Sequence, residues 1–178
     1  MNIGLIARRY ATVLYEYADK KGDLEETYQC VSDIRAAFEQ APSSLSFLAS
    51  PLRKQSEKLN LVNGVFAKNV AQSLADFLVF LVEKERIDMV DDILRVFQSL
   101  YRKRKGIKSA VITTAIELSA EKQAKFTNEL SVKLNAPVET LYNTDSDIIG
   151  GVIFTIDGKQ LDNSVKHQLE EIEKQLKV

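Results

Sequence analysis

The spacing of apolar residues changes once along this chain, near Gly106, and that change limits the fold more than any other feature. Before Gly106 apolar residues recur every three or four positions, which is the period of an amphipathic helix. After it they alternate, as in a strand, and one face of the predicted strand carries Ala110, Ile112, Ile116 and Leu118. The sequence therefore predicts two domains, an all-helical one over 1–105 and a mixed one over 106–178.

Six helices separated by short loops fit into the first domain. Ser50 and Pro51 are predicted to begin the fourth helix, because serine is a good cap and proline suits the first helical position. Asn69 and Gln72 resemble a capping box that opens the fifth helix. Gly106 suits the left-handed position that closes the sixth. We therefore predict a compact six-helix bundle.

The second domain is predicted to follow the order β-α-β-β-α. Its first helix starts after Ser119 and ends at Asn135. Asp157 and Gly158 form a tight-turn dipeptide that joins two antiparallel strands. The last helix has apolar residues at spacings of four, three and four, namely Val165, Leu169, Ile172 and Leu176. The chain as a whole is expected to belong to the α+β class.

Composition and charge exclude several classes of protein. The chain has 178 residues, 45% hydrophobic and 28% charged, with a net charge of -1, which argues against disorder and against a global attraction to polyanions. The longest apolar run, 77–82, is far shorter than the roughly 18 residues that span a bilayer. Charges near the start, such as Arg8 and Arg9, do not fit a secretory signal. The single cysteine is compatible with a reducing compartment, so we expect a cytoplasmic protein.

The glycine-rich stretch near the end of the chain does not fit a phosphate-binding loop. Around Gly158 and Lys159 that motif needs glycine at 153 and serine or threonine at 160, where Ile153 and Gln160 stand. We therefore expect no nucleotide cofactor. With one histidine and one cysteine, no familiar zinc cluster can be assembled either. We expect no metal and no catalytic residues.

The run 102–105 (RKRK) is the only dense cluster of cations. One interpretation places it in the last turn of the sixth helix, where cations offset the negative end of the helix dipole. Another makes it a contact for an acidic partner, and a rival hypothesis for the whole protein is a nucleic-acid-binding adaptor that uses this run. A second rival is a small nucleotide-dependent enzyme built around Gly150 and Gly151.

Two helices have more apolar surface than a bundle requires. The first carries the stripe Ala7, Ala11, Leu14 and Ala18 and, beside it, a second stripe, Ile6, Tyr10, Val13 and Tyr17. The fifth adds Val79 and Phe80 to a face that is already complete. Either a central helix buries both stripes, or the excess lines a groove for an amphipathic partner helix.

Three segments resemble, in order, the delta subunit family of the F-type ATP synthase, whose mitochondrial counterpart is the oligomycin-sensitivity-conferring protein. They are ARRYATVLYEYA at 7–18, LVFLVEKERIDMVDDILRVFQSLYRKRKG at 78–106, and DIIGGVIFTIDGKQLDNSV at 147–165. The resemblance covers nearly the full length. It implies a non-catalytic stator subunit that holds the catalytic head still while proton flow turns the rotor.

The resemblance also implies where partners bind. The helical domain of such proteins binds the N-terminal helix of an alpha subunit in a groove between its first and fifth helices. Tyr10 and Phe80 match the family's groove positions, and Ile6, Val13 and Phe77 join them by helical spacing. The family often has a smaller residue where Phe80 stands.

For the second domain, the resemblance implies contact with the C-terminal region of the membrane-anchored b subunits. The protein would then lie at the cytoplasmic face of a bacterial membrane and touch it only through the complex, with no nucleic acid and no cofactor. Gly150, Gly151 and Asp162 match the family's pattern. We expect the glycines to admit the chain into a strand and the acid to cap the last helix.

Overall fold

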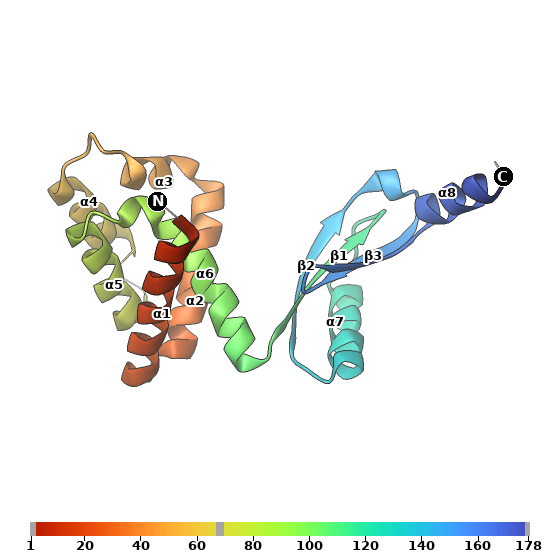
Figure 1. The fold of residues 1–178 in the computed structure, drawn as a ribbon, viewed down its shortest axis with the longest axis horizontal. Helices are drawn as coiled ribbons and strands as arrows, with labels where there is room; N and C mark the ends of the chain where they lie inside the picture. The colour runs from red at the N-terminus through yellow and green to blue at the C-terminus, as the bar shows by residue number, and fades with distance from the viewer. Residues whose placement is uncertain (1–2, 67–69, 177–178) are drawn as a thin grey trace. The chain divides into compact units, whose positions relative to one another are not determined.

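The computed structural model describes residues 3–66 and 70–176 (Figure 1). It is a mixed α+β structure, which confirms the predicted class. The chain divides into two compact units, Met1–Tyr101 and Arg102–Val178. The first is helical and the second contains the sheet, so each is described by itself.

The described α-helices are α1 (Ile3–Lys21), α2 (Leu24–Gln40), α3 (Pro42–Ala49), α4 (Gln55–Leu61), α5 (Gln72–Glu83), α6 (Val90–Lys105), α7 (Ala120–Leu134) and α8 (Val165–Leu176). The short segments are a π-helical one, η1 (Val62–Phe66), and two 3₁₀ turns, η2 (Ile87–Met89) and η3 (Ser146–Ile148). The strands are β1 (Lys108–Thr114), β2 (Val138–Thr144), β3 (Gly151–Ile156) and β4 (Lys159–Ser164).

The core of the first unit lies where α1, α2, α5 and α6 face one another. The first stripe of α1 is buried there, and so are the apolar faces of the other three helices, including Val31, Ile34, Leu74, Leu81, Ile93, Leu94 and Phe97. The alanines of α1 let its backbone approach its neighbours closely, and α1 packs directly against α2 and α5. Burial of this one stripe fixes how α1 is rotated about its axis.

The N-terminus of α5 is capped from outside its own helix. Its N-cap is Ala71, which has no side-chain oxygen, and the predicted cap residue Asn69 lies outside the described residues. Asp23, between α1 and α2, accepts the N–H of Ser73 at 3.0 Å and the Ser73 hydroxyl at 2.7 Å. A carboxylate at this helix end also offsets the positive end of the dipole. Asp23 therefore locks α5 to the α1–α2 turn.

The predicted start of the fourth helix at Ser50 and Pro51 was wrong. Ser50 is instead the C-cap residue of α3, and α4 begins at Gln55. The Ser50 hydroxyl accepts the N–H of Leu52 at 3.3 Å. Serine side chains often bond the backbone two residues on, which favours a turn over a helix start. The proline at a first helical position is Pro42, in α3.

In the second unit the strands lie in the order β2-β1-β3-β4. β1 and β2 are parallel and connected through α7, whereas β1–β3 and β3–β4 are antiparallel. Tyr142 of β2 donates its hydroxyl to the Gln123 carbonyl of α7 at 2.5 Å, which ties the helix to the sheet. Ala110 and Ile112 lie on β1 as predicted, and both are buried. β1 ends at Thr114, so the prediction that Ile116 and Leu118 lie on this strand was wrong.

Positive backbone angles mark the turns. Gly106 follows α6 at φ 68°, and the next N–H returns to the Arg102 carbonyl at 2.9 Å, as in a Schellman closure. Asp157 and Gly158 join β3 to β4 at φ 48° and 82°. Gly151 opens β3 at φ 80°, and Gly150 precedes it.

The predicted cap of the last helix by Asp162 was wrong in its detail. The hydroxyl of Ser164 accepts the N–H of His167 at 3.1 Å, which makes Ser164 the residue that caps α8. Asp162 accepts the N–H of Ser164 at 2.9 Å and so orients the capping residue. The acid lies two residues before the capping position and does not cap the helix amides, because β4 continues through it to Ser164.

Within residues 3–66 and 70–176, none of the helices has the length and apolar character required to span a bilayer.

Three glycine-to-alanine variants test the backbone argument. A Cβ at position 151 would lie 2.3 Å from the Asn163 carbonyl oxygen, in addition to its positive φ, so Gly151→Ala should cost about 3 kcal/mol or more of unfolding free energy. At position 158 an added Cβ has no close neighbour, so Gly158→Ala introduces only the strain of the positive φ and should cost about 1 kcal/mol of unfolding free energy. Position 64 has neither a close neighbour for an added Cβ nor a positive φ, so Gly64→Ala should change the free energy of unfolding by less than about 1 kcal/mol. Urea denaturation followed by circular dichroism measures all three, and equal losses would contradict the argument.

Candidate functional site: a groove between α1 and α5

The second apolar stripe of α1 is not buried by the first unit. Ile6 and Tyr10 are partly exposed, Val13 is 52% exposed and Tyr17 also faces solvent. The first stripe of the same helix is almost completely buried. Of the two alternatives left open by the sequence, the structure therefore excludes a central helix that buries both stripes.

Helix α5 lies beside this exposed stripe and supplies two aromatic rings. Phe77 is only 4% exposed, so it belongs mainly to the core, whereas Phe80 is partly exposed. The ring centroids of Tyr10 and Phe80 are 6.2 Å apart, and those of Phe80 and Phe77 are 6.3 Å apart. Both distances suit tilted aromatic packing. The three rings form a continuous aromatic floor across the two helices.

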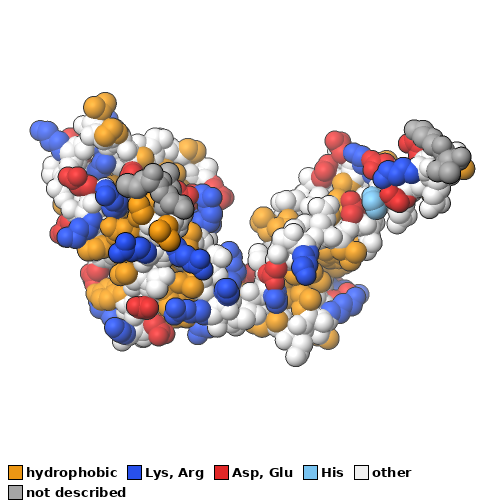
Figure 2. Space-filling view, viewed as in Figure 1, with side chains coloured by type: hydrophobic (Ala, Val, Ile, Leu, Met, Phe, Trp, Pro, Cys, Tyr) orange, Lys and Arg blue, Asp and Glu red, His pale blue; other side chains and the backbone are white. Residues whose placement is uncertain are grey.

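Two hollows lie over this floor and share Val13 and Phe80. One, of ≈ 330 Å³, is lined by Ile6, Arg9, Tyr10, Val13, Phe80 and Arg86. The other, of ≈ 260 Å³, is lined by Val13, Tyr17, Asp76, Phe77 and Phe80. We call the two together the α1/α5 groove. All five residues predicted for the groove line it, and Figure 2 shows hydrophobic side chains interspersed with cations on the visible face of the helical unit.

The two ends of the α1/α5 groove differ in charge. Arg9 and Arg86 line one end, and the Lys84 amine lies 5.7 Å from the Phe80 ring centroid. At the other end Asp76 accepts hydrogen bonds from Tyr17 at 2.8 Å and Lys21 at 2.9 Å. Because Lys21 compensates Asp76, the groove has an apolar centre, one cationic end and one nearly neutral end.

Sequence reasoning missed the polar residues of this groove. Arg9 and Arg86 belong to the motifs that carry the family resemblance. Whether their side chains face the groove, however, depends on how α1 and α5 are rotated about their axes. Asp76 was not singled out because its partners Tyr17 and Lys21 are more than fifty positions away. The one available signal was helical spacing, since Asp76 lies four residues before Phe80.

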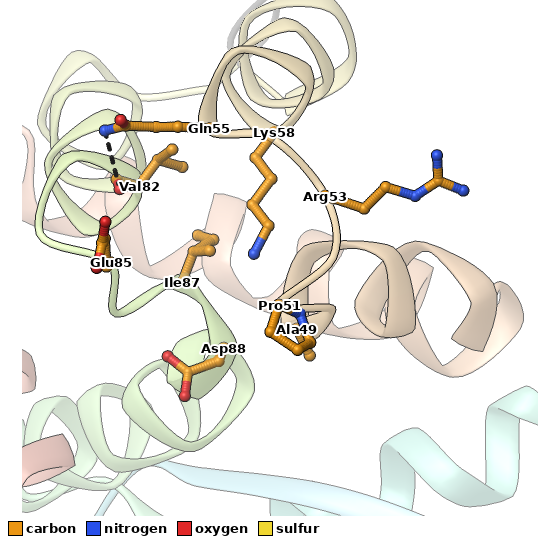
Figure 3. A pocket seen from close by; sticks show the side chains of 9 residues that line it. All are labelled: Ala49, Pro51, Arg53, Gln55, Lys58, Val82, Glu85, Ile87 and Asp88. Carbon is orange, nitrogen blue, oxygen red and sulfur yellow. Dashed lines mark hydrogen bonds between the residues drawn. The ribbon is translucent and has the colours of Figure 1, made fainter.

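Another hollow, of ≈ 340 Å³, lies in the same unit where the α3–α4 connection meets the end of α5 (Figure 3). Lys58 points into it, and Glu85 and Asp88 stand around it, so charges of both signs line it. This mixture does not match the apolar face of an amphipathic helix. We therefore take the α1/α5 groove as the candidate site.

The other motifs do not form a site. The run 102–105 occupies the last turn of α6, as the helix-dipole interpretation requires, and Arg102 lies 3.4 Å from Glu139. Gly150 and Gly151 lead into strand β3 and not into the helix N-terminus that a phosphate loop needs. Within the described ranges, 3–66 and 70–176, no three His, Cys, Asp or Glu side chains gather in a way that would hold a metal ion.

Alanine substitutions should separate the core ring from the groove ring. Phe77→Ala removes a buried ring and should cost about 3–5 kcal/mol of unfolding free energy. Phe80→Ala removes a ring that the chain itself only partly covers and should cost about 1–2 kcal/mol. Urea denaturation of the full chain measures both, and a larger loss for Phe80 would place that ring in the core.

The nearly neutral end of the groove, where Lys21 compensates Asp76, leads to a prediction about the pKa of Asp76. Hydrogen bonds from Lys21 and Tyr17 hold the pKa of Asp76 below its ordinary value. The stabilisation is therefore present at neutral pH and lost as the pH falls through that lowered pKa, and it is small because solvent screens the exposed pair. In a carboxyl NMR titration, Lys21→Met should raise the pKa of Asp76 toward its ordinary value, whereas Lys20→Met should leave it unchanged. Equal effects of the two variants would contradict the contact.

Comparison with known proteins gives the same family over nearly the whole chain. The family model described as ATP synthase delta (OSCP) subunit matches residues 6–176. The ATP synthase subunit delta of Desulforamulus reducens is 32% identical over 173 residues, which cover 97% of this chain and 96% of that protein. The corresponding subunit of Clostridioides difficile is 30% identical over 175 residues, covering 98% and 97%.

A solved structure has the same fold. One chain of the cryo-EM structure of the Toxoplasma gondii mitochondrial ATP synthase hexamer matches 97% of this chain, with 97% of that chain covered and a TM-score of 0.75. Its sequence identity is 22%, so this likeness concerns the fold. Together with the sequence matches, it confirms the resemblance carried by the three motifs. The chain belongs to the ATP synthase delta (OSCP) subunit family.

Proposed function

We propose that this subunit is a non-catalytic stator component, whose helical unit, taken as the predicted six-helix bundle, binds the N-terminal helix of an alpha subunit in the α1/α5 groove. The observation that carries the proposal is the exposed second stripe of α1 beside the partly exposed Phe80. An amphipathic helix recognises such a groove through side chains at spacings of three and four. Tyr10 and Phe80 are the proposed anchors, with Ile6, Val13 and Phe77 completing the apolar surface.

The charge at the ends of the groove supports one orientation of the bound helix. Arg9 and Arg86 favour acidic side chains or the C-terminal end of a helix, whose dipole is negative. At the other end of the groove Lys21 compensates the charge of Asp76, so that end favours neither sign of charge in the bound helix. The apolar centre supplies slow dissociation, and the cationic end selects the direction in which the partner lies.

The second unit is proposed to contact the C-terminal region of the b subunits at the cytoplasmic face of the membrane. The protein then reaches the membrane only through its partners. When proton flow turns the rotor, the catalytic head experiences a reaction torque and would rotate with the rotor unless it were held. A subunit bound to the head at one unit and to the stalk at the other resists that rotation without any chemistry of its own.

The rival hypotheses have less support. The comparisons do not support a nucleic-acid-binding adaptor, and part of the run 102–105 is engaged with Glu139. A nucleotide-dependent enzyme around Gly150 and Gly151 would need those residues to lead into a helix, but they lead into β3. A stator subunit without cofactor or nucleic acid remains the function that the groove supports best.

A carboxylate in the groove should abolish head binding. Isothermal titration calorimetry of the full chain with a peptide of the first twenty or so residues of the cognate alpha subunit should show at least about 30-fold weaker binding for Tyr10→Asp. The reason is that a charged group would be buried against the apolar face of the peptide. Equal affinity of wild type and variant would remove the α1/α5 groove as the binding site.

Asn60→Asp provides a matched control. It adds the same charge at an exposed position of α4 that lines neither hollow, so peptide affinity should stay within about twofold of the wild type. Circular dichroism should show the same helix content for both variants. Loss of binding in the control as well would indicate a general effect of charge.

A further inference from the structure

Two side chains separate the two hollows of the α1/α5 groove. Val13 of α1 and Phe80 of α5 line both hollows, so they stand at the boundary between them. Because they come from the two helices that form the sides of the groove, they approach its middle from opposite sides. We call Val13 and Phe80 together the partition. The apolar surface of the groove is therefore divided into two sites and is not one smooth channel.

The Phe80 side of the partition is held in place by its neighbours. The ring centroid of Phe80 lies 6.2 Å from that of Tyr10 and 6.3 Å from that of Phe77, and the Lys84 amine lies 5.7 Å from the ring centroid. Tilted ring pairs and a cation close to an aromatic ring are both favourable contacts. Phe77 is almost buried and cannot follow a movement of Phe80. A rotation of the Phe80 ring away from the groove would therefore break contacts with both helices.

The Val13 side of the partition is stiff for a different reason. A β-branched side chain within a helix has one strongly preferred χ1 rotamer, and Val13 lies in the middle of α1. Val13 is 52% exposed, so its methyl groups are available to a bound partner. The partition is therefore expected to keep its shape when a helix enters the groove.

Each hollow can hold one large apolar side chain. The volumes are ≈ 330 Å³ and ≈ 260 Å³, and an apolar cavity of about 150 Å³ is enough for a benzene ring. Along α1 the first hollow extends from Ile6 to Val13, and the second extends from Val13 to Tyr17. At a rise of about 1.5 Å per residue, these lengths are about 10 Å and about 6 Å. A helix that lies along the groove thus meets a hollow, the partition and a second hollow in turn.

The width of the partition determines how far apart the two large side chains must be. A group packed against an aromatic ring keeps its centre at least about 4.5 Å from the ring centroid, so two such groups on opposite sides of Phe80 are at least about 9 Å apart. Residues four positions apart on a helix are separated by only about 6 Å along its axis, whereas residues seven apart are separated by about 10.5 Å. The spacing of seven meets the requirement and the spacing of four does not.

The residue between the two large ones faces the partition. Residues on one face of a helix recur at intervals of three and four, so one residue of the partner lies three or four positions from each large side chain. A large side chain at this position would overlap with Val13 and Phe80, because neither can move aside. Alanine, glycine or serine leaves the space that the partition requires.

We infer that Phe80 is a specificity-determining residue of the α1/α5 groove: it selects a partner helix with a small residue opposite the partition and two large apolar residues, seven positions apart, on either side. The inference rests on the proposed function, which identifies this helix as the N-terminal helix of an alpha subunit. It adds the sequence pattern that the helix carries. Arg9 and Arg86 select the direction of the helix, and the partition selects its register along the groove.

The test is a coupling measurement by isothermal titration calorimetry, with the full chain and a peptide of the first twenty or so residues of the cognate alpha subunit. Each small residue on the apolar face of the peptide is replaced in turn by leucine. One of these peptides should bind the wild type at least about tenfold more weakly than the native peptide does. With Phe80→Ala the same replacement should weaken binding by less than about threefold, because the space for leucine has been created.

Phe47→Ala is the matched control for the coupling measurement. Phe47 is also a partly exposed phenylalanine, but it lies on α3 and lines neither hollow. In this variant the leucine replacement should still weaken binding at least about tenfold, as in the wild type. Relief of the leucine peptide by the control as well would show that the effect does not come from the partition.

The other side of the partition gives an independent readout. Val13→Phe adds apolar surface to the groove but thickens the partition, so it should weaken binding of the native peptide at least about fivefold. If apolar area alone determined affinity, this variant would bind as tightly as the wild type or more tightly. Because Val13 is 52% exposed, circular dichroism should show that the variant folds.

The possible outcomes separate the inference from the proposed function. If the wild type binds the native peptide, but every leucine replacement has the same effect on the wild type and on Phe80→Ala, the inference is wrong and the head contact stands. Unchanged or tighter binding by Val13→Phe would also overturn the inference. If the wild type does not bind the native peptide, the proposed head contact is itself wrong, and the inference fails with it.

Discussion

The arrangement of the helical unit depends on the burial of one stripe of α1 against α2 and α5. Three small residues, Ala7, Ala11 and Ala18, bring the helices close together, and Leu14 fills the space between them. Because burial of this stripe sets the rotation of α1, the neighbouring stripe faces outward beside α5. Asp23 adds a second constraint by capping α5 from the α1–α2 turn. The groove is thus a consequence of core packing.

Each unit has a helix with an apolar face that the other described residues of that unit leave exposed. In the helical unit the groove has an aromatic floor and a cationic end. In the second unit the exposed apolar face belongs to α8 and carries Val165, Leu169, Ile172 and Leu176.

Much of the fold was predictable because it depends on local spacing. The change of period near Gly106, the turn at Asp157 and Gly158, and the helical spacing of apolar residues in α8 all involve residues that are close in sequence. The errors occurred where short-range rules compete. Ser50 bonds its local backbone in place of starting a helix, and Asp162 orients the capping residue in place of capping the helix. Ile116 alternates with its neighbours although β1 has already ended.

The sequence by itself determined that two helices carry surplus apolar residues and that three motifs match one family, because both properties are visible along the chain. Only the tertiary structure decided which stripe of α1 is buried, and that Phe77 is nearly buried at the groove whereas Phe80 is partly exposed in it. It also decided that Arg9, Arg86 and Asp76 line the groove. The close approach of Gly150 to Val165 also depends on it. These features depend on contacts between residues far apart in sequence, and helical spacing carries no information about which distant side chains will meet.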